Sequence, residues 1–573
     1  MKQEWRKAQA WQADTLMATA RAGGPDAALA ARRAAALTEL REPALAREAL
    51  AIAVRLEPLD PVAKLALARL HAEAGDLDAA SNEAAGVLVD SFDQGARARA
   101  AFILGEIQRV QGDRDAARRH YEIALRIEDD LLATNRNDAT AARWYARARG
   151  RLAELDATAG DRNRAQSGAE GALAMLRAAA AQIGETPALA ADIADAELRL
   201  GALELDNDQP GSARRRFGEA IERYEALAVT ETSEPHWRAV LADAWALAAE
   251  ADYVRGAADH ARAAMEKATQ ARIGLAANFP DEEWALAGVW RVRGALRAAL
   301  GDHDVAAESY AQAAALAAKL AQKAGTAEAP SRFLVHALLD QADHALRTGA
   351  LPIARDAADL ARRRAEAFAA SQGAHATWLG DAAACWDRLG EVARAAKAHA
   401  PMQDAFARAV EFRRLALERG GKEPRFARGL AAALLKQGEA ALEAGEQTLA
   451  RTAFGESVGL RLLLAEATPT DVRAAHALAA ALERAGLAAR AMGDTEAARH
   501  AWEDELALAN RIFPRDSLEG LRFRAIVESH LVSVGGLRAE DHRASALDRF
   551  DALAKAGVLT EQEASLRRSL WRA

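Results

Sequence analysis

Residues 294–313 read GALRAALGDHDVAAESYAQA, and the spacing within this stretch decides the fold. Relative to Gly301, another glycine lies seven residues earlier, Ala306 lies five later, Tyr310 nine later and Ala313 twelve later. Spacings of four and three place the last three side chains on one face of a helix. The stretch therefore predicts a glycine turn followed by a helix whose buried face carries small and aromatic residues.

The same frame recurs along the whole chain. Its twelve origins are Arg41, Gly75, Gly112, Gly160, Asp208, Gly256, Gly301, Gly349, Ala400, Gly445, Gly493 and, less clearly, Asp541. The position five residues after the origin is alanine in all twelve. The first two steps are 34 and 37 residues long and the later ones 45–51, periods that indicate a stacked repeat array.

The change of period predicts longer helices rather than longer loops. Lengthening a repeat from 34 to 48 residues adds 14, which is close to four turns at 3.6 residues per turn. Because whole turns keep the apolar stripe on the same face, the added length is expected to extend the helices themselves.

Each unit is predicted to be two antiparallel helices. The origin glycine suits the left-handed end of the first helix, and an Asp that follows it can accept hydrogen bonds from the start of the second. That Asp is present at Asp76, Asp113, Asp161, Asp302 and Asp494. Prolines, which suit helix starts, mark the exits at Pro58, Pro187, Pro235, Pro280, Pro330, Pro424, Pro469 and Pro514, and two exits use Asn135–Asp138 and Ser371–Gly373.

In this repeat pattern the sequence resembles the tetratricopeptide repeat (TPR) family. The unit around Gly112 carries the match, with Leu104, Gly105, Ala117, Tyr121 and Ala124. The resemblance covers about residues 30–555 and implies an all-α fold, an α-solenoid of about 11–12 antiparallel helix hairpins in a right-handed superhelix. The long period is similar to a bacterial TPR variant attached to signalling or effector domains.

The resemblance also organises the chain into three segments. Residues 1–29 are expected to be an N-terminal helical cap or the stub of an upstream domain, and residues 30–555 the repeat array, with short repeats to about residue 135. Residues 556–573 are expected to form a C-terminal capping helix, because Thr560 and Glu563 make a capping box.

Composition excludes several classes of function. The net charge of −8 over 573 residues provides no field suited to nucleic acid. A single cysteine, Cys385, excludes a disulfide framework and a cysteine-based zinc site. No run of about 18 uncharged apolar residues is present, so we expect no membrane insertion. The N-terminus lacks the apolar core of a signal peptide, so the expected location is cytoplasmic.

No motif predicts catalysis, a metal or a cofactor. Asp302, His303 and Asp304 are potential ligands, but adjacent side chains on a turn diverge, and a helix start is favoured. Residues 420–422 lack the spacing of a phosphate loop, and Cys385 is typical of a small core residue. The spacing of Trp237, Trp284 and Trp378 near the starts of first helices, with Trp144 and Phe426 in comparable places, predicts one aromatic per repeat packed in the core between repeats.

The resemblance implies that the first helix of each unit lines a concave groove, partly through the position six before the origin. With the position thirteen before, this gives the candidate partner-binding residues Arg99, Glu106, Arg147, Glu154, Asp195, Asp243, Glu250 and Asp343. The same counting from Ala400 gives Arg394 and Asp387. A partly acidic groove favours a protein or peptide partner with a basic or mixed-charge segment.

The sequence therefore predicts a non-catalytic protein–protein interaction scaffold, or the sensor or regulatory repeat domain of a bacterial signalling or defence system. One alternative is a ligand-sensing repeat domain that relays to an absent effector domain. A less favoured hypothesis is an α/α-toroid enzyme. It requires convergent carboxylates in a closed pocket, and the repeat pattern contains no insertion that would provide them.

Overall fold

The computed structural model describes residues 2–39, 42–230, 235–371, 375–421, 423–468 and 471–572. Within these ranges the chain contains 26 α-helices, one short 3-10 helix and no β-strand, which confirms the all-α prediction. Several positions used in the sequence argument lie outside the described residues: Arg41, Gln372, Gly373, Lys422 and Pro469.

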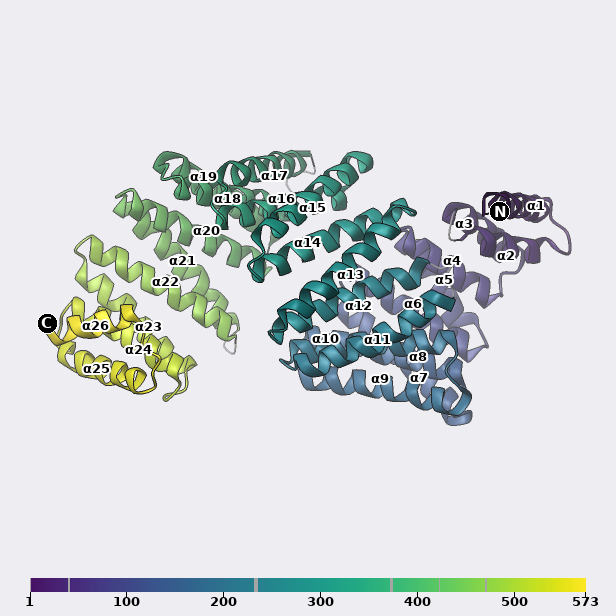
Figure 1. The fold of residues 1–573 in the computed structure, drawn as a ribbon, viewed down its shortest axis with the longest axis horizontal. Coiled ribbons are helices and arrows are strands. Elements are labelled where there is room, and N and C mark those ends of the chain that lie inside the picture. The colour runs from purple at the N-terminus through teal and green to yellow at the C-terminus, as the bar shows by residue number, and fades with distance from the viewer. Residues whose placement is uncertain are drawn as a thin grey trace. The chain divides into compact units, whose positions relative to one another are not determined.

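The helices form twelve hairpins between a single N-terminal helix, α1 (Lys2–Ala22), and a single C-terminal helix, α26 (Glu561–Arg572) (Figure 1). Residues 1–282 form one compact unit, here unit 1, and residues 283–573 form unit 2. The hairpins of unit 1 are α2 (Ala27–Thr38) with α3 (Pro43–Leu56), α4 (Pro61–Glu73) with α5 (Leu77–Asp90), α6 (Gln94–Gln111) with α7 (Arg114–Thr134), α8 (Ala139–Thr158) with α9 (Arg162–Ile183), α10 (Pro187–Asp206) with α11 (Pro210–Thr230), and α12 (Pro235–Val254) with α13 (Ala258–Ala276).

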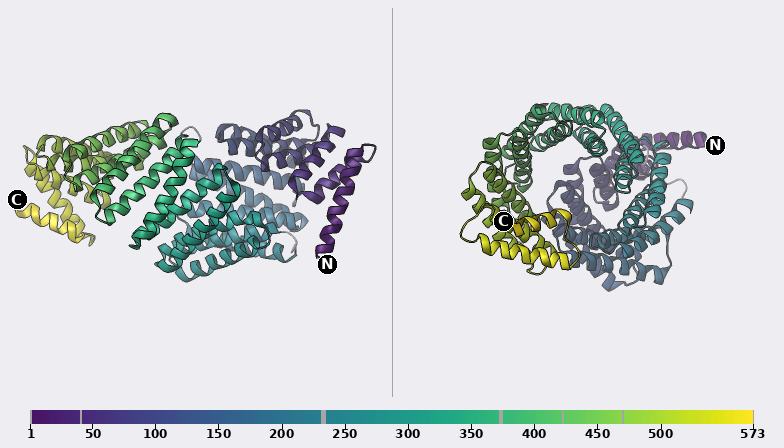
Figure 2. Two further views of the ribbon diagram at one scale, coloured as in Figure 1. Left: turned by 90° about the horizontal axis from the view of Figure 1, so that it is seen from above. Right: turned by 60° about the vertical axis from the view of Figure 1, so that its left-hand side comes forward.

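Unit 1 ends with the 3-10 helix η1 (Pro280–Glu282). The hairpins of unit 2 are α14 (Glu283–Ala299) with α15 (His303–Ala324), α16 (Glu328–Arg347) with α17 (Leu351–Ser371), α18 (Ala376–Ala395) with α19 (His399–Gly420), α20 (Pro424–Glu443) with α21 (Gln447–Ala467), α22 (Val472–Ala491) with α23 (Thr495–Ile512), and α24 (Leu518–Ser533) with α25 (Ala539–Lys555). Within each unit successive helices pack side by side (Figure 2). The chain is thus a TPR-like α-solenoid with twelve hairpins.

The longer repeats have longer helices, as predicted. Helices α4 and α5 of a short repeat have 13 and 14 residues, whereas α8 and α9 of a long repeat have 20 and 22. The added length is close to two turns in each helix, so the buried stripe of the second helix keeps its register.

The turns also follow the prediction at most origins. Eight origin glycines are left-handed, with φ between 76° and 88°: Gly75, Gly112, Gly160, Gly256, Gly301, Gly349, Gly445 and Gly493. In four repeats the next residue caps the second helix by accepting a backbone N–H three residues ahead: Asp76, Asp113, Asp161 and Asp494. Asp302 stands at the same helix start, and its carboxylate accepts a hydrogen bond from Arg297 Nη1 at 3.0 Å.

The origin predicted in the ninth repeat is wrong. The left-handed residue is Lys397, with φ of 56°, and not Ala400. Lys397 lies 48 residues after Gly349 and 48 before Gly445, so the irregular steps in this part of the chain disappear. The slip arose because three residues are almost one helical turn, which makes the buried Ala405 resemble the expected alanine.

The twelfth repeat also differs from the predicted frame. Its second helix is in the predicted register, since Ala546 and Phe550 are fully buried. The turn, however, lies several residues before Asp541, at Gly535 and Gly536, both with positive φ. Because the turn comes earlier, Val534, which lies seven residues before Asp541, is the C-cap of α24 and not a small residue inside the first helix, as Gly294 is before Gly301.

The two helices of a hairpin are matched in volume at their closest approach. In six repeats a glycine seven before the origin faces an aromatic ring nine after it: Gly105 with Tyr121, Gly201 with Phe217, Gly294 with Tyr310, Gly390 with Phe406, Gly438 with Phe454, and Gly486 with Trp502. A Cβ on any of the six glycines would lie less than 3 Å from the ring. Where the first position is alanine, the second is smaller or aliphatic, as in Ala249 with Met265.

The tryptophans near the starts of first helices are only partly core residues. Trp378 is fully buried and stacks on Phe368 with ring centroids 4.6 Å apart. Trp284 is 39% exposed, although its ring packs on Phe333 with the ring centroids 4.7 Å apart. The prediction of one buried aromatic per repeat therefore needs correction at Trp284, which lies at the edge of the interface.

Replacing Lys397 by glycine is expected to stabilise unit 2 by about 1 kcal/mol, because a left-handed residue with a Cβ is strained. Lys397 is solvent-exposed, so no buried contact is lost. The urea midpoint of the full chain, followed by circular dichroism, measures the change. Lys397→Ala keeps the strain and serves as the control, and equal midpoints for the two variants would contradict the expectation.

Candidate partner-binding surfaces

In unit 1, two of the predicted groove residues belong to a chain of ion pairs between first helices. Arg151 on α8 contacts Glu106 on α6 at 2.8 Å and Glu154 on its own helix at 2.9 Å. Arg199 on α10 contacts Oε1 of the same Glu154 carboxylate at 3.0 Å. Burial alone would raise the pKa of Glu106, but Arg151 and the Tyr121 hydroxyl outweigh it, so the pKa lies below its usual value.

The same geometry repeats in unit 2. A carboxylate six before one origin pairs with an arginine or lysine nine before the next: Asp343 with Arg388, Glu391 with Lys436 at 3.2 Å, and Glu439 with Arg484 at 3.1 Å. Together with Glu106–Arg151 and Glu154–Arg199, these pairs form what we call the ion-pair ladder. Each of its carboxylates is paired with a cation of the neighbouring hairpin, so the predicted groove would be less acidic than the sequence indicates.

Three more predicted residues are held by neighbours, whereas Glu250 is not. Arg147 pairs with Asp192 at 2.8 Å, and Asp195 accepts a hydrogen bond from the Tyr224 hydroxyl. Asp243 pairs with Arg272 at 2.6 Å. Within the described chain, the carboxylate of Glu250 is exposed and has no cation or hydrogen-bond donor beside it.

The remaining predicted residue, Arg99, is half-buried near the buried carboxyl of Glu128. Burial raises the pKa of Glu128 to about 8, and the positive charge of Arg99 opposes that rise. This pair is therefore part of the interface between α6 and α7.

The register slip also misplaced two first-helix residues. Six before Lys397 is Glu391, and not Arg394, which lies one turn further on and pairs with Glu391 at 2.9 Å and with Glu443 at 3.1 Å. Asp387 is half-buried, and burial raises the pKa of its carboxyl.

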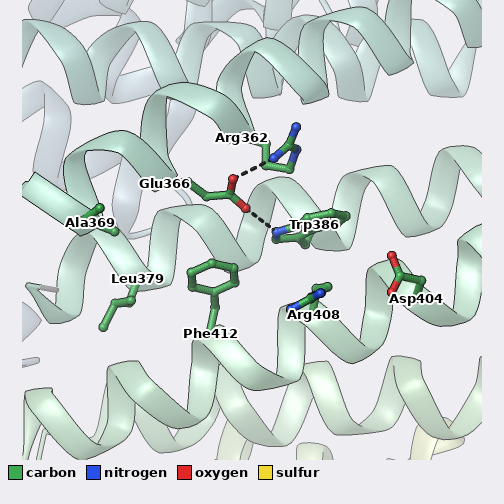
Figure 3. Close-up of a pocket in the computed structure, with 9 residues that line it drawn as sticks. Arg362, Glu366, Ala369, Leu379, Trp386, Asp404, Arg408 and Phe412 are labelled. Carbon is green, nitrogen blue, oxygen red and sulfur yellow. Dashed lines mark hydrogen bonds and ion pairs between the residues drawn. The ribbon is translucent and has the colours of Figure 1, made fainter.

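A cleft of about 560 Å³ lies between α17, α18 and α19 (Figure 3). Glu366 is held between two neighbours: Trp386 Nε1 donates to it at 2.8 Å, and Arg362 contacts it at 2.7 Å. Phe412, Leu379 and the Trp386 ring supply apolar lining, while Asp404 and Arg408 are exposed at the rim. The cleft combines an aromatic floor with charges of both signs.

A second cleft of about 420 Å³ shares two of these residues, Trp386 and Asp404. Its other lining residues come from the same three helices, including Asp356, Asp359 and Pro401, and from the turn at Ala398. Trp386 and Asp404 therefore line both hollows.

Sequence reasoning missed Trp386 because of the register slip. Counted from Lys397, Trp386 lies eleven residues earlier, the position held by Trp245 and Trp290 in their own repeats. A cation lies over each of the three rings: Lys267 at 3.9 Å from Trp245, Arg293 at 5.2 Å from Trp290, and Arg362 at 5.1 Å from Trp386. The correct register would have placed Trp386 at this recurring tryptophan position, but not the cations, which come from three different positions in their repeats.

The side chains considered above as possible metal ligands or nucleophiles have the following surroundings. No group of three His, Cys, Asp or Glu residues in the described ranges is arranged to hold a metal ion. Cys385 is fully buried, and burial raises the pKa of its thiol. His303 lies at a helix start, where its backbone carbonyl oxygen accepts a hydrogen bond from His344 Nε2 at 3.0 Å. Of the helices searched in the described ranges, none has the length and apolar character needed to cross a bilayer.

No protein-family model matches the chain, and no curated protein matches it. Among solved structures it is similar to BtubC from P. vanneervenii, with 20% identity, 47% of this chain and 92% of that chain covered, and a TM-score of 0.31. It is also similar to yeast Tom70, with 14% identity, 88% of this chain and 96% of that chain covered, and a TM-score of 0.38. It is similar as well to the apo form of RapI, with 13% identity, 53% of this chain and 98% of that chain covered, and a TM-score of 0.37. TM-scores below 0.5 are too low for these proteins to indicate a function for this chain.

Proposed function

We propose that the chain is a non-catalytic protein–protein interaction scaffold or sensor domain of a bacterial signalling or defence system. The observation that carries the proposal is the cleft at Trp386. Aromatic and arginine side chains dominate the energetics of protein interfaces, and this cleft places Trp386 and Phe412 behind a rim that includes Arg408 and Asp404. A stacked array also presents an extended surface that suits an elongated partner segment.

The rim favours a partner segment of mixed charge with an apolar side chain. Arg408 is 53% exposed and Asp404 is exposed too, so a bound segment meets both signs of charge. In the predicted first-helix groove, by contrast, three of the six predicted carboxylates are paired within the ion-pair ladder, and Asp243 is paired with Arg272. Glu250 is the predicted residue best suited to a basic segment there.

Charge reversal at the rim tests the proposal. A partner is first identified by affinity capture from the native host, and its affinity for the full chain is then measured by calorimetry. We expect Asp404→Arg combined with Arg408→Glu to weaken binding at least tenfold with an unchanged melting temperature.

Two further variants locate the surface. Glu418→Arg changes an exposed residue of the same helix outside the cleft and is the matched control. If Glu250→Arg alone weakens binding, the partner occupies the first-helix groove and the assignment to the cleft is wrong. If neither surface matters, the proposal fails for both.

A further inference from the structure

A second contact between first helices recurs at a fixed position. The residue seventeen before the origin is arginine in three long repeats: Arg143, Arg332 and Arg428. In two of them the next repeat supplies an aspartate sixteen before its own origin. Arg143 contacts Asp192, and Arg332 contacts Asp381 at 2.9 Å.

The third arginine lacks this carboxylate. Opposite Arg428 on α20, the position sixteen before the next origin is Ala477 on α22. Both residues line a pocket of about 330 Å³ between α20, α21 and α22, which pack side by side in unit 2 (Figure 1). The pocket therefore lies where the other two repeats place an aspartate.

Two more guanidinium groups line the same pocket. Arg461 extends from α21 and donates to the carbonyl oxygen of Ala477, and burial lowers the pKa of Arg461 below its usual value. Arg473 is exposed at the rim. Within the described ranges, none of Arg428, Arg461 and Arg473 pairs with a carboxylate.

The acid that lines the pocket is committed to another role. Asp471 begins α22, and its Oδ1 accepts the backbone N–H groups of Arg473 at 2.9 Å and Ala474 at 3.3 Å. The rest of the lining is mainly apolar, including Ala431, Leu464 and Ala467. The pocket thus combines excess positive charge with an apolar wall, and its volume is that of a small-ligand site.

We propose that this pocket binds a carboxylate that carries a short apolar body. The carboxylate takes the place of the missing aspartate and contacts Arg428 and Arg461, because paired guanidinium groups suit a planar carboxylate. The apolar body packs on Leu464 and the alanines. A free small carboxylate and an acidic side chain of a protein segment share this chemistry, and the inference does not depend on the cleft at Trp386.

Calorimetry on the full chain tests the site with four probes: hexanoate, hexyl phosphate, hexanamide, and a blocked tetrapeptide of alternating glutamate and leucine. We expect hexanoate to bind in the millimolar range or tighter and hexanamide at least tenfold more weakly. Arg428→Gln is expected to weaken hexanoate about tenfold, and because Arg428 is exposed this variant leaves the fold intact. Binding of the tetrapeptide more tightly than hexanoate identifies a protein segment as the source, and the reverse order identifies a small molecule.

Ala477→Asp is the decisive variant, since it rebuilds the contact made by Asp192 and Asp381. It should raise the melting temperature of the unliganded chain and abolish hexanoate binding. The assignment is overturned if hexanamide binds as well as hexanoate, if hexyl phosphate binds tenfold more tightly, if no carboxylate probe binds, or if Ala477→Asp leaves binding unchanged.

Discussion

Gly438→Ala is expected to destabilise unit 2 by about 1–3 kcal/mol, the usual range for overpacking a core. The result would run against helix propensity, since alanine in a helix interior is favoured over glycine by about 0.5–1 kcal/mol. The cause is steric. A Cβ at Gly438 would lie 2.5 Å from the ring of Phe454, which is fully buried and has no space to move into.

The facing helix supplies a matched control. Gly455 on α21 is exposed and has no heavy atom within 4 Å of an added Cβ, so Gly455→Ala should be neutral or slightly stabilising. Gly438→Ala with Phe454→Met reproduces the Ala249–Met265 combination and should recover part of the loss. Urea midpoints of the full-length variants measure these differences. Equal stability of Gly438→Ala and Gly455→Ala would refute the expectation that the residue facing a large ring must be glycine.

The second large effect concerns the buried carboxyl of Glu505, which is 2% exposed on α23. Burial, with Glu483 nearby, raises the pKa of Glu505 to about 9. Between the usual glutamate pKa and about 9, the unfolded chain releases a proton that the folded chain keeps. The free energy of unfolding therefore falls as the pH rises through this window.

Glu505→Gln removes that penalty. We expect it to raise stability at pH 8 by on the order of 3 kcal/mol, while having little effect below the unfolded pKa. Urea midpoints at pH 4 and pH 8 measure the difference. Asp504→Asn, at the exposed neighbouring position, should not change the pH dependence. A Glu505→Gln gain that is equal at both pH values would show that the carboxyl is ionised in the folded chain.

The fold could be predicted from the sequence because its determinants are local. Small residues at fixed distances from a glycine turn define each hairpin, and Ala46, Ala117 and Ala213 are fully buried at the predicted position. The capping box also forms as predicted, with Thr560 N donating to Glu563 at 2.8 Å. The prediction failed where Lys397 stands in place of glycine, because an alanine one turn later satisfied the pattern.

The surfaces could not be predicted in the same way. Whether Asp343 is free depends on Arg388, 45 residues away on another hairpin, and that contact is set by how neighbouring hairpins stack. The sequence contains both charges but not the register between the helices that carry them. The cleft at Trp386 likewise needs three helices in place before its lining residues meet.

Where the ion-pair ladder is continuous, from α16 to α22, loss or duplication of one whole unit would preserve the charge pairing between first helices. In-frame removal of residues 349–396, one 48-residue period, would place Asp343 opposite Lys436 instead of Arg388, so opposite charges would still meet at the new junction. Unequal recombination between neighbouring repeats would therefore lengthen or shorten the coding sequence without creating a like-charge contact at the junction of the two joined repeats. In this part of the chain, array length is a quantity that evolution can change in single steps.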